Sequence, residues 1–303
     1  MIRQEVYVYD KRLQGTTSRL APDRIVAVSN PATSGPLVSC LMVTRGDLAR
    51  VRLSIGTFKR QSYGNTELVI VCDAVTAGLR RLIEESGANV RLIDIGERLS
   101  LGSLRNISIE QARGEIVCQW DDDDIYGAHR IERGVGALLQ AKADAVFLRQ
   151  WCIWSPGQRL LKLSRSRLWE GSMLAFRQAL PRYPDIRSAE DTALVEAMNA
   201  HRVIALMDDP LSYCYCIHGQ NTYGGSHFQQ MITGARLELR YGEALAALSA
   251  FFAFAEHPAM SEADLALRDR HAGDLGQLRR LETYVATNQL FRRLRHRFGG
   301  WSA

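Results

Sequence analysis

The 303-residue sequence contains no apolar run long enough to cross a membrane. Its most apolar stretch, ALAALSAFFAFA at residues 244–255, falls well short of the roughly 20 apolar residues that a spanning helix needs. The first residues, MIRQEVYVYDKR, lack the continuous apolar core of a secretory signal. We therefore expect neither a spanning helix nor a secretory leader, and we expect the protein in the cytoplasm.

Cysteine is also scarce, and none of the six cysteines has the spacing of a zinc-binding knuckle. Cys40, Cys72 and Cys118 lie in apolar, strand-like runs, and Cys214 and Cys216 alternate with tyrosines. We interpret them as small buried side chains of a reduced protein. The net charge of +5 is modest, so composition does not indicate nucleic acid as a partner. A hydrophobic content of 46% is ordinary for a soluble globular protein.

What the sequence does contain is a regular alternation of apolar strands and helices. Strands are predicted at PLVSCLMVT, ELVIVCD, NVRLIDI, EIVCQW and ADAVFLR, with helical segments between them. Continuous apolar strands that alternate with helices indicate a mostly parallel sheet, covered by helices on both faces. Ligands of such α/β folds bind at the carboxyl ends of the strands.

The chain divides into three predicted regions. Residues 1–36 read as an N-terminal extension and linker that ends in SNPATSGP. Residues 37–225 form the α/β domain, with hairpin-like strands after residue 150 and a helix near SAEDTALVEAMNAH. Residues 226–303 are rich in Ala, Leu and Arg, and we expect them to be helical.

Four consecutive acids, in QWDDDDIYGAHR, directly follow the fourth predicted strand. Asp121 to Asp124 therefore lie at the ligand-binding edge of the sheet, as does Asp73 at the end of the second strand. Carboxylates packed this closely repel one another, and a bound divalent cation relieves the repulsion. A solvated loop tip is the alternative, and Asp124 could instead cap the helix that follows.

A second acidic pair, Glu190-Asp191, opens a predicted amphipathic helix. The segment Ser188-Ala189-Glu190-Asp191 also fits an S-x-x-D capping box, so a helix-start role for Asp191 remains an alternative to a catalytic one.

Several of these segments together resemble the family 2 glycosyltransferases of the GT-A fold. They are RQSYGNTELVIVCD, LGSLRNISIEQARGEIVCQWDDDD, WEGSMLAFR and SAEDTALVEAM, in an order that spans residues 36–225. The resemblance implies an α/β GT-A fold with a helical C-terminal extension. It implies a hexosyltransferase-like enzyme that moves a sugar, with inversion, from a nucleotide-diphospho-sugar (most often a UDP sugar) to an acceptor hydroxyl. It further implies dependence on Mn²⁺ or Mg²⁺ and a role in polysaccharide synthesis.

Residue roles follow from the resemblance. It makes Asp191 the general base, with Glu190 binding the acceptor or orienting the base. It makes Asp123 the metal ligand, aided by Asp121 and His218. Trp169 would bind the acceptor, and the nucleotide-sugar would contact Thr44, Arg45, Asp73, Arg105, Asp121 and Asp122.

Four of these residues have plainer interpretations. Asp73 could be a turn residue, since the family's usual Asp-Asp-Gly-Ser reads Cys-Asp-Ala-Val here. Arg105 could be a surface arginine paired with an acid, Trp169 a core residue, and His218 a structural histidine.

The segment LFRRLRHRFGGW at residues 290–301 places apolar side chains on one helical face and arginines elsewhere. Such a segment could lie on the inner face of the membrane beside a glycan or lipid-linked acceptor, pack onto the domain, or bind a partner.

Two other functions compete with sugar transfer. One is a sugar-nucleotide pyrophosphorylase, although VTRGDLARVR holds only one glycine where a triphosphate-binding loop would need several. The other is a non-catalytic scaffold that binds a nucleotide sugar on the same fold.

Overall fold

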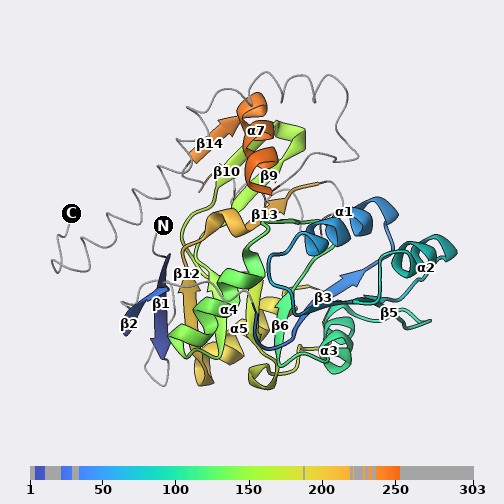
Figure 1. The fold of residues 1–303 in the computed structure, drawn as a ribbon, viewed down its shortest axis with the longest axis horizontal. Helices are drawn as coiled ribbons and strands as arrows, with labels where there is room; N and C mark the ends of the chain where they lie inside the picture. Colours follow the sequence, from blue (N-terminus) through green and yellow to red (C-terminus); the bar gives the residue numbers. More distant parts are fainter. Residues whose placement is uncertain are drawn as a thin grey trace.

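The computed structural model describes residues 4–10, 22–28, 34–186, 188–218 and 237–252, together with residues 221, 228, 231 and 233. A nine-stranded sheet in the order β2-β1-β12-β8-β11-β6-β3-β4-β5 runs through this part of the chain (Figure 1). Its strands are β1 Gln4–Asp10, β2 Arg24–Val28, β3 Val38–Thr44, β4 Thr66–Cys72, β5 Val90–Asp94, β6 Ile116–Gln119, β8 Ala145–Leu148, β11 Trp169–Phe176 and β12 Val203–Met207.

The predicted mostly parallel α/β sheet is confirmed. Strands β6, β3, β4 and β5 are mutually parallel neighbours, and β12 is parallel to β8. The exception in the centre is β11, which runs antiparallel to both β6 and β8. The continuous apolar sequence of β3 and β4 reflects burial on both faces of the sheet.

Alternate side chains of the strands enter two separate cores. In β3, Cys40 and Met42 pack with α1 (Leu48–Lys59), α2 (Ala77–Glu84) and α4 (Arg130–Ala141) on one face. Leu41 between them points to the opposite face, which α3 (Leu101–Gln111) covers. The helix α5 (Glu190–His201) packs on β11 and β12. Each helix therefore packs on the sheet through its apolar face. Because neighbouring parallel strands end on the same side, the loops that follow them lie together at one edge of the sheet.

A smaller five-stranded sheet adjoins the large one, in the order β14-β10-β9-β13-β7. Helix α7 (Tyr241–Phe252) packs against β10 and β14, and these elements form the layer at the top of Figure 1. The strands are β7 Ile125–Tyr126, β9 Cys152–Ser155, β10 Leu160–Leu163, β13 Tyr213–Cys216 and β14 Leu237–Arg240, and short 3₁₀ turns lie at Pro156–Gln158, Arg177–Ala179 and Pro210–Ser212.

The regions before and after the predicted α/β domain both contain strands that the sequence analysis did not predict. Within the predicted extension, β1 pairs antiparallel with β12 and with β2, and it buries Val6, Tyr7 and Val8 completely. These residues are therefore part of the large sheet, in which β1 lies between the edge strand β2 and β12. In the predicted helical region, residues 237–240 form a strand that pairs with β10. The predicted amphipathic segment at 290–301 lies outside the described residues.

In the part of the chain that the structure describes, no helix combines the length and apolarity that crossing a membrane requires.

Candidate active site

The acid loop, residues 121–124, follows β6 at the carboxyl end of this parallel strand. Trp120, just before it, is fully buried and donates its backbone N–H to the carbonyl of Leu41 at 3.0 Å. The hydroxyl of Tyr126 lies 2.6 Å from the backbone nitrogen of Asp121, and the Trp120 and Tyr126 rings pack 3.9 Å apart. Buried aromatic side chains therefore hold the loop at the edge of the sheet, where sequence reasoning placed it.

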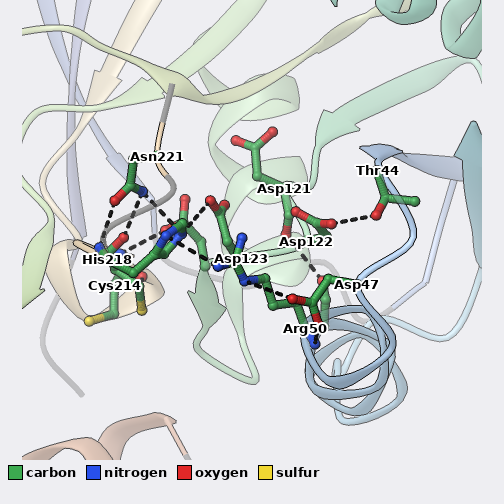
Figure 2. Close-up of polar contacts among 12 residues, drawn as sticks. Thr44, Asp47, Arg50, Asp121, Asp122, Asp123, Cys214, His218 and Asn221 are labelled. Carbon is green, nitrogen blue, oxygen red and sulfur yellow. Dashed lines mark hydrogen bonds and ion pairs between the residues drawn. The ribbon is translucent and has the colours of Figure 1, made fainter. Parts of the chain in front are cut away.

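The four carboxylates of the loop turn to different partners. In Figure 2 the Asp122 carboxylate points to Thr44 and the Asp123 carboxylate to His218, whereas Asp121 points away from both. The pairs, in chain order, are Asp121 with Arg105, Asp122 with Thr44, Asp123 with His218, and Asp124 with Tyr213 and the backbone of Cys216. The loop is therefore an ordered set of acids and not a solvated tip.

Burial sets the electrostatics of this loop. It raises the pKa of Asp122 to about 7, with the neighbouring charge of Asp123 adding to the effect and the Thr44 hydroxyl opposing it. Burial also raises the pKa of Asp121, while the guanidinium of Arg105 opposes that rise. Both carboxyl groups would thus be stabilised as anions by an added positive charge.

Asp124 has a structural position that the sequence did not reveal. Its side chain is 1% exposed and accepts hydrogen bonds from the Tyr213 hydroxyl and, at 2.7 Å, from the backbone N–H of Cys216. The expectation that Asp124 might cap the next helix is wrong, because α4 begins at Arg130 with His129 as its N-cap. Asp124 instead ties the acid loop to β13.

Arg105 joins the acid loop to the start of α5. Its Nε donates to Oε1 of Glu190 at 2.9 Å, and its Nη2 donates to Oδ1 of Asp121 at 3.3 Å. Burial disfavours the charged guanidinium, but nearby anionic groups, Asp121 foremost, outweigh it and raise the pKa of Arg105. Arg105 is therefore not a surface arginine: it is a buried cation shared by two acids from separate segments.

The pair Glu190-Asp191 begins α5, but not through the predicted capping box. The N-cap is Ala189, in a left-handed conformation with φ 61°, and it makes no side-chain capping bond. Glu190 is 3% exposed, and burial raises its pKa. Asp191 accepts from the backbone N–H of Thr192 at 2.8 Å. The capping interpretation of Ser188 is wrong because Ala189 occupies the cap position.

Seven of the predicted site residues line one cavity of about 220 Å³, namely Arg105, Asp121, Asp122, Asp123, Trp169, Glu190 and Asp191. Thr44 and His218 adjoin it through their hydrogen bonds to Asp122 and Asp123. The remaining two predicted residues neither line the cavity nor bond to its acids. Arg45 is exposed, and Asp73, which follows β4, pairs with Arg98 at 3.4 Å.

Aromatic side chains form one wall of the cavity. Trp151 stacks on Trp169 with ring centroids 4.4 Å apart, on Tyr213 at 4.8 Å and on Tyr215 at 5.2 Å. Trp169 is 3% exposed, so it packs as a core residue and also borders the cavity. Sequence reasoning missed Trp151 and the tyrosines, although the Tyr-Cys-Tyr-Cys alternation of β13 places both tyrosines on one face.

Among the described residues, no group of three or more His, Cys, Asp or Glu side chains is arranged to hold a metal ion. The oxygen donors of the acid loop nevertheless suit Mg²⁺ or Mn²⁺, which commonly bind through one or two carboxylates together with phosphate oxygens.

A mostly parallel sheet with an acid loop at its carboxyl edge, facing a helix that starts with Glu-Asp, is the arrangement of a GT-A glycosyltransferase domain. The model of glycosyl transferase family 2 matches residues 39–191. The chain belongs to this family, and the resemblance inferred from the sequence is confirmed.

Two curated relatives each match about a third of the chain. A Bacillus subtilis (strain 168) protein with a provisional glycosyltransferase name, EpsE, is 30% identical over 109 residues, which cover 35% of this chain and 39% of EpsE. The Escherichia coli UDP-Glc:alpha-D-GlcNAc-diphosphoundecaprenol beta-1,3-glucosyltransferase WfgD is 26% identical over 105 residues, 34% of this chain and 42% of WfgD. The chain therefore aligns with about two fifths of each relative.

Among solved structures, residues 1–349 of TarS from S. aureus in complex with UDP-GlcNAc align with a TM-score of 0.51. The sequence identity is 16%, and the alignment covers 78% of this chain and 72% of the TarS chain. This likeness supports the fold.

Proposed function

We propose that this protein transfers a sugar from a nucleotide-diphospho-sugar to an acceptor hydroxyl, with inversion at the anomeric carbon. One observation carries the proposal: the acid loop and the Glu190-Asp191 pair face the same cavity and are joined across it by Arg105. A donor bound at the loop would then lie next to a base at the start of α5.

The acid loop is the proposed site of the donor diphosphate. Asp123 and Asp121 are the residues that would hold a divalent cation there, with phosphate oxygens completing its ligands. When bound, Mn²⁺ or Mg²⁺ would stabilise the diphosphate leaving group as a Lewis acid. Thr44 fixes the carboxylate of Asp122 through its hydroxyl, and Arg105 offers guanidinium N–H groups suited to phosphate oxygens.

Asp191 is the proposed general base. Direct attack by the acceptor hydroxyl inverts configuration and needs one base near the acceptor oxygen. Asp191 lines the cavity, and the N–H of Thr192 fixes its Oδ1. Glu190 is held in its ion pair with Arg105, so it orients the start of α5 and leaves Asp191 to accept the proton.

A UDP sugar as donor and a glycan or lipid-linked acceptor are proposals supported by the relatives. WfgD is named for a UDP-Glc donor and a diphosphoundecaprenol-linked acceptor, and TarS was solved with UDP-GlcNAc. A role in cell-surface glycan synthesis at the cytoplasmic side of the membrane extends the same proposal.

A panel of nucleotide sugars tested for thermal stabilisation and slow donor hydrolysis, with and without Mn²⁺, tests this function. We expect one nucleoside class to stabilise the protein when Mn²⁺ is present. Donor hydrolysis should require Asp123 and the same cation. Stabilisation by a nucleoside triphosphate and sugar phosphate, with no response to any nucleotide sugar, would favour a pyrophosphorylase, and no response to either set would favour a scaffold.

A further inference from the structure

A four-residue segment that precedes α5 lies along α3. We call residues 183–186 the strap, since they run from the 3₁₀ turn Arg177–Ala179 towards the helix that carries Asp191. The buried side chain of Asn106, in the middle of α3, makes two hydrogen bonds to the backbone of one strap residue. Its Nδ2 donates to the carbonyl of Tyr183, and its Oδ1 accepts from the N–H of Tyr183, each at 2.9 Å. Asn106 therefore holds this residue through both of its backbone polar groups, as a neighbouring antiparallel strand would.

Close backbone packing joins the strap to the first turn of α3. The backbone N–H of Gly102 donates to the carbonyl of Ile186 at 3.2 Å. A Cβ at Gly102 would lie only 1.9 Å from the carbonyl oxygen of Pro184, so no larger side chain fits there while the strap keeps its place. This contact therefore sets the distance between the strap and α3.

Two serines hold the strap from its exposed side. The hydroxyl groups of Ser100, the N-cap of α3, and of Ser103 both donate to Oδ1 of Asp185, the second at 2.9 Å. The side chain of Asp185 is exposed, so these two bonds can be removed without emptying any part of the core. Each of the four strap residues thus meets α3.

The start of α5 has no side-chain cap of its own. Ala189 occupies the N-cap position and makes no side-chain capping bond. The first buried apolar residue of α5 is Leu194, which lies almost a full turn beyond Asp191. The place of the first turn is therefore set by α3, through the ion pair of Arg105 with Glu190 and through the strap that leads into the helix.

We propose that Asn106, together with Gly102 and Asp185, positions Asp191 for proton transfer by holding the strap on α3. Asn106 is not among the residues that line the cavity, so it is a positioning residue that acts through the chain joining the strap to α5. This role rests on the proposed function, in which Asp191 is the base. A misplacement of a reacting group by about 1 Å can cost roughly 10²-fold in rate, so a loosened strap should be visible in the kinetics.

Replacing Asn106 tests the role by two independent measurements. Asn106→Leu removes both hydrogen bonds to Tyr183 and keeps a side chain of similar size. In hydrogen–deuterium exchange, the amides of the strap and of the first turn of α5 should exchange faster than in the wild type. With the nucleotide sugar that the donor panel selects, the rate of Mn²⁺-dependent hydrolysis at saturating donor should fall roughly 10- to 100-fold, while the KM for the donor stays at the wild-type value.

Ser39→Ala is the matched control for lost stability. The fully buried hydroxyl of Ser39 donates to Glu67 at 2.7 Å and accepts from the backbone N–H of Gly114 at 2.9 Å, so its removal should also lower the melting temperature. Ser39 lies near the amino end of β3, opposite the edge that carries the acid loop. The control should therefore change neither the exchange of the strap nor the rate of hydrolysis, measured below the melting temperature of every variant.

Asp185→Ala is a second variant that should fold even where Asn106→Leu does not, because the side chain it removes is exposed. It should lower the rate in the same direction by a smaller factor. A wild-type rate or wild-type strap exchange in folded Asn106→Leu, or in Asp185→Ala, would overturn the positioning role and leave the proposed function standing. An equal loss of rate in Ser39→Ala would do the same. If the wild type hydrolyses no nucleotide sugar, the proposed function and the positioning role both fail.

Discussion

Arg105 of α3 and Glu190 of α5, 85 residues apart in sequence, form a buried ion pair with Nε and Oε1 2.9 Å apart. The same guanidinium reaches Asp121, so the pair connects the start of α5 to the acid loop. The proposed base and the proposed donor site therefore keep a fixed relation before any substrate binds.

The first prediction concerns the stability of this connection. Arg105→Met leaves the buried carboxylate of Glu190 and the half-buried one of Asp121 without their cation, and the free energy of unfolding should fall by about 3 kcal/mol, as expected when one partner of a buried pair is removed. Urea denaturation measures this change in the free energy of unfolding. Arg182→Met is the control: its pair with Glu110 is exposed, with side chains 77% and 52% accessible, so it should change stability little. Equal losses in both variants would contradict a special role for Arg105.

The second prediction separates catalysis from binding at α5. Asp191→Asn should lower the rate of transfer by at least about 10²-fold, the usual contribution of a positioned base, while the affinity for the donor stays near that of the wild type. Steady-state kinetics with calorimetric titration of the nucleotide measures both quantities. Glu196→Gln, an exposed acid on the same helix, should leave the rate unchanged. Full activity in Asp191→Asn would remove this residue from the mechanism.

The third prediction distinguishes neighbouring acids in the loop. Asp124→Ala leaves the Tyr213 hydroxyl and the Cys216 N–H without their acceptor and should cost about 2 kcal/mol of unfolding free energy. Asp124→Asn keeps an acceptor for Cys216 and a polar partner for Tyr213, so its loss should be much smaller. Asp123→Asn should abolish Mn²⁺-dependent nucleotide binding with little change in stability. The assignment fails if Asp124→Ala is as stable as the wild type.

The fourth prediction concerns the backbone at Ala189. A left-handed conformation costs a residue with a Cβ about 1–2 kcal/mol, which glycine avoids. Ala189→Gly should therefore leave the free energy of unfolding unchanged or raise it by up to about 1 kcal/mol. Ala193→Gly, inside α5, should lower it by about 1 kcal/mol. Thermal or urea unfolding of both variants measures these changes. A similar decrease in the free energy of unfolding of the two variants would contradict the strain argument.

Much of the fold was predictable because its signals are local. Apolar strands alternate with helices, and this pattern fixed both the mostly parallel sheet and the edge at which Asp121 and Asp123 lie. The Glu190-Asp191 pair was also located correctly at a helix start.

The features of the site that the sequence analysis missed depend on contacts between residues that are distant in sequence. The bonds of Arg50 to His218 and of Asp124 to Cys216 join positions 168 and 92 residues apart. Local rules likewise favoured Ser188 as a cap, and the backbone conformation of Ala189 displaced it. Such outcomes follow from how the segments pack, which no short window of sequence contains.

The position of β1 between β2 and β12 has a consequence for the order of folding during synthesis. Residues 4–10 leave the ribosome before the other strands of the large sheet and pair with β2, but their other neighbour, β12, ends at Met207. The pair of β1 and β2, which carries the buried Val6 and Val8, can therefore dock on the large sheet only after β12 has been made. Because unpaired apolar strand edges promote aggregation, the docking of β1 on β12 removes one such edge from the nascent protein.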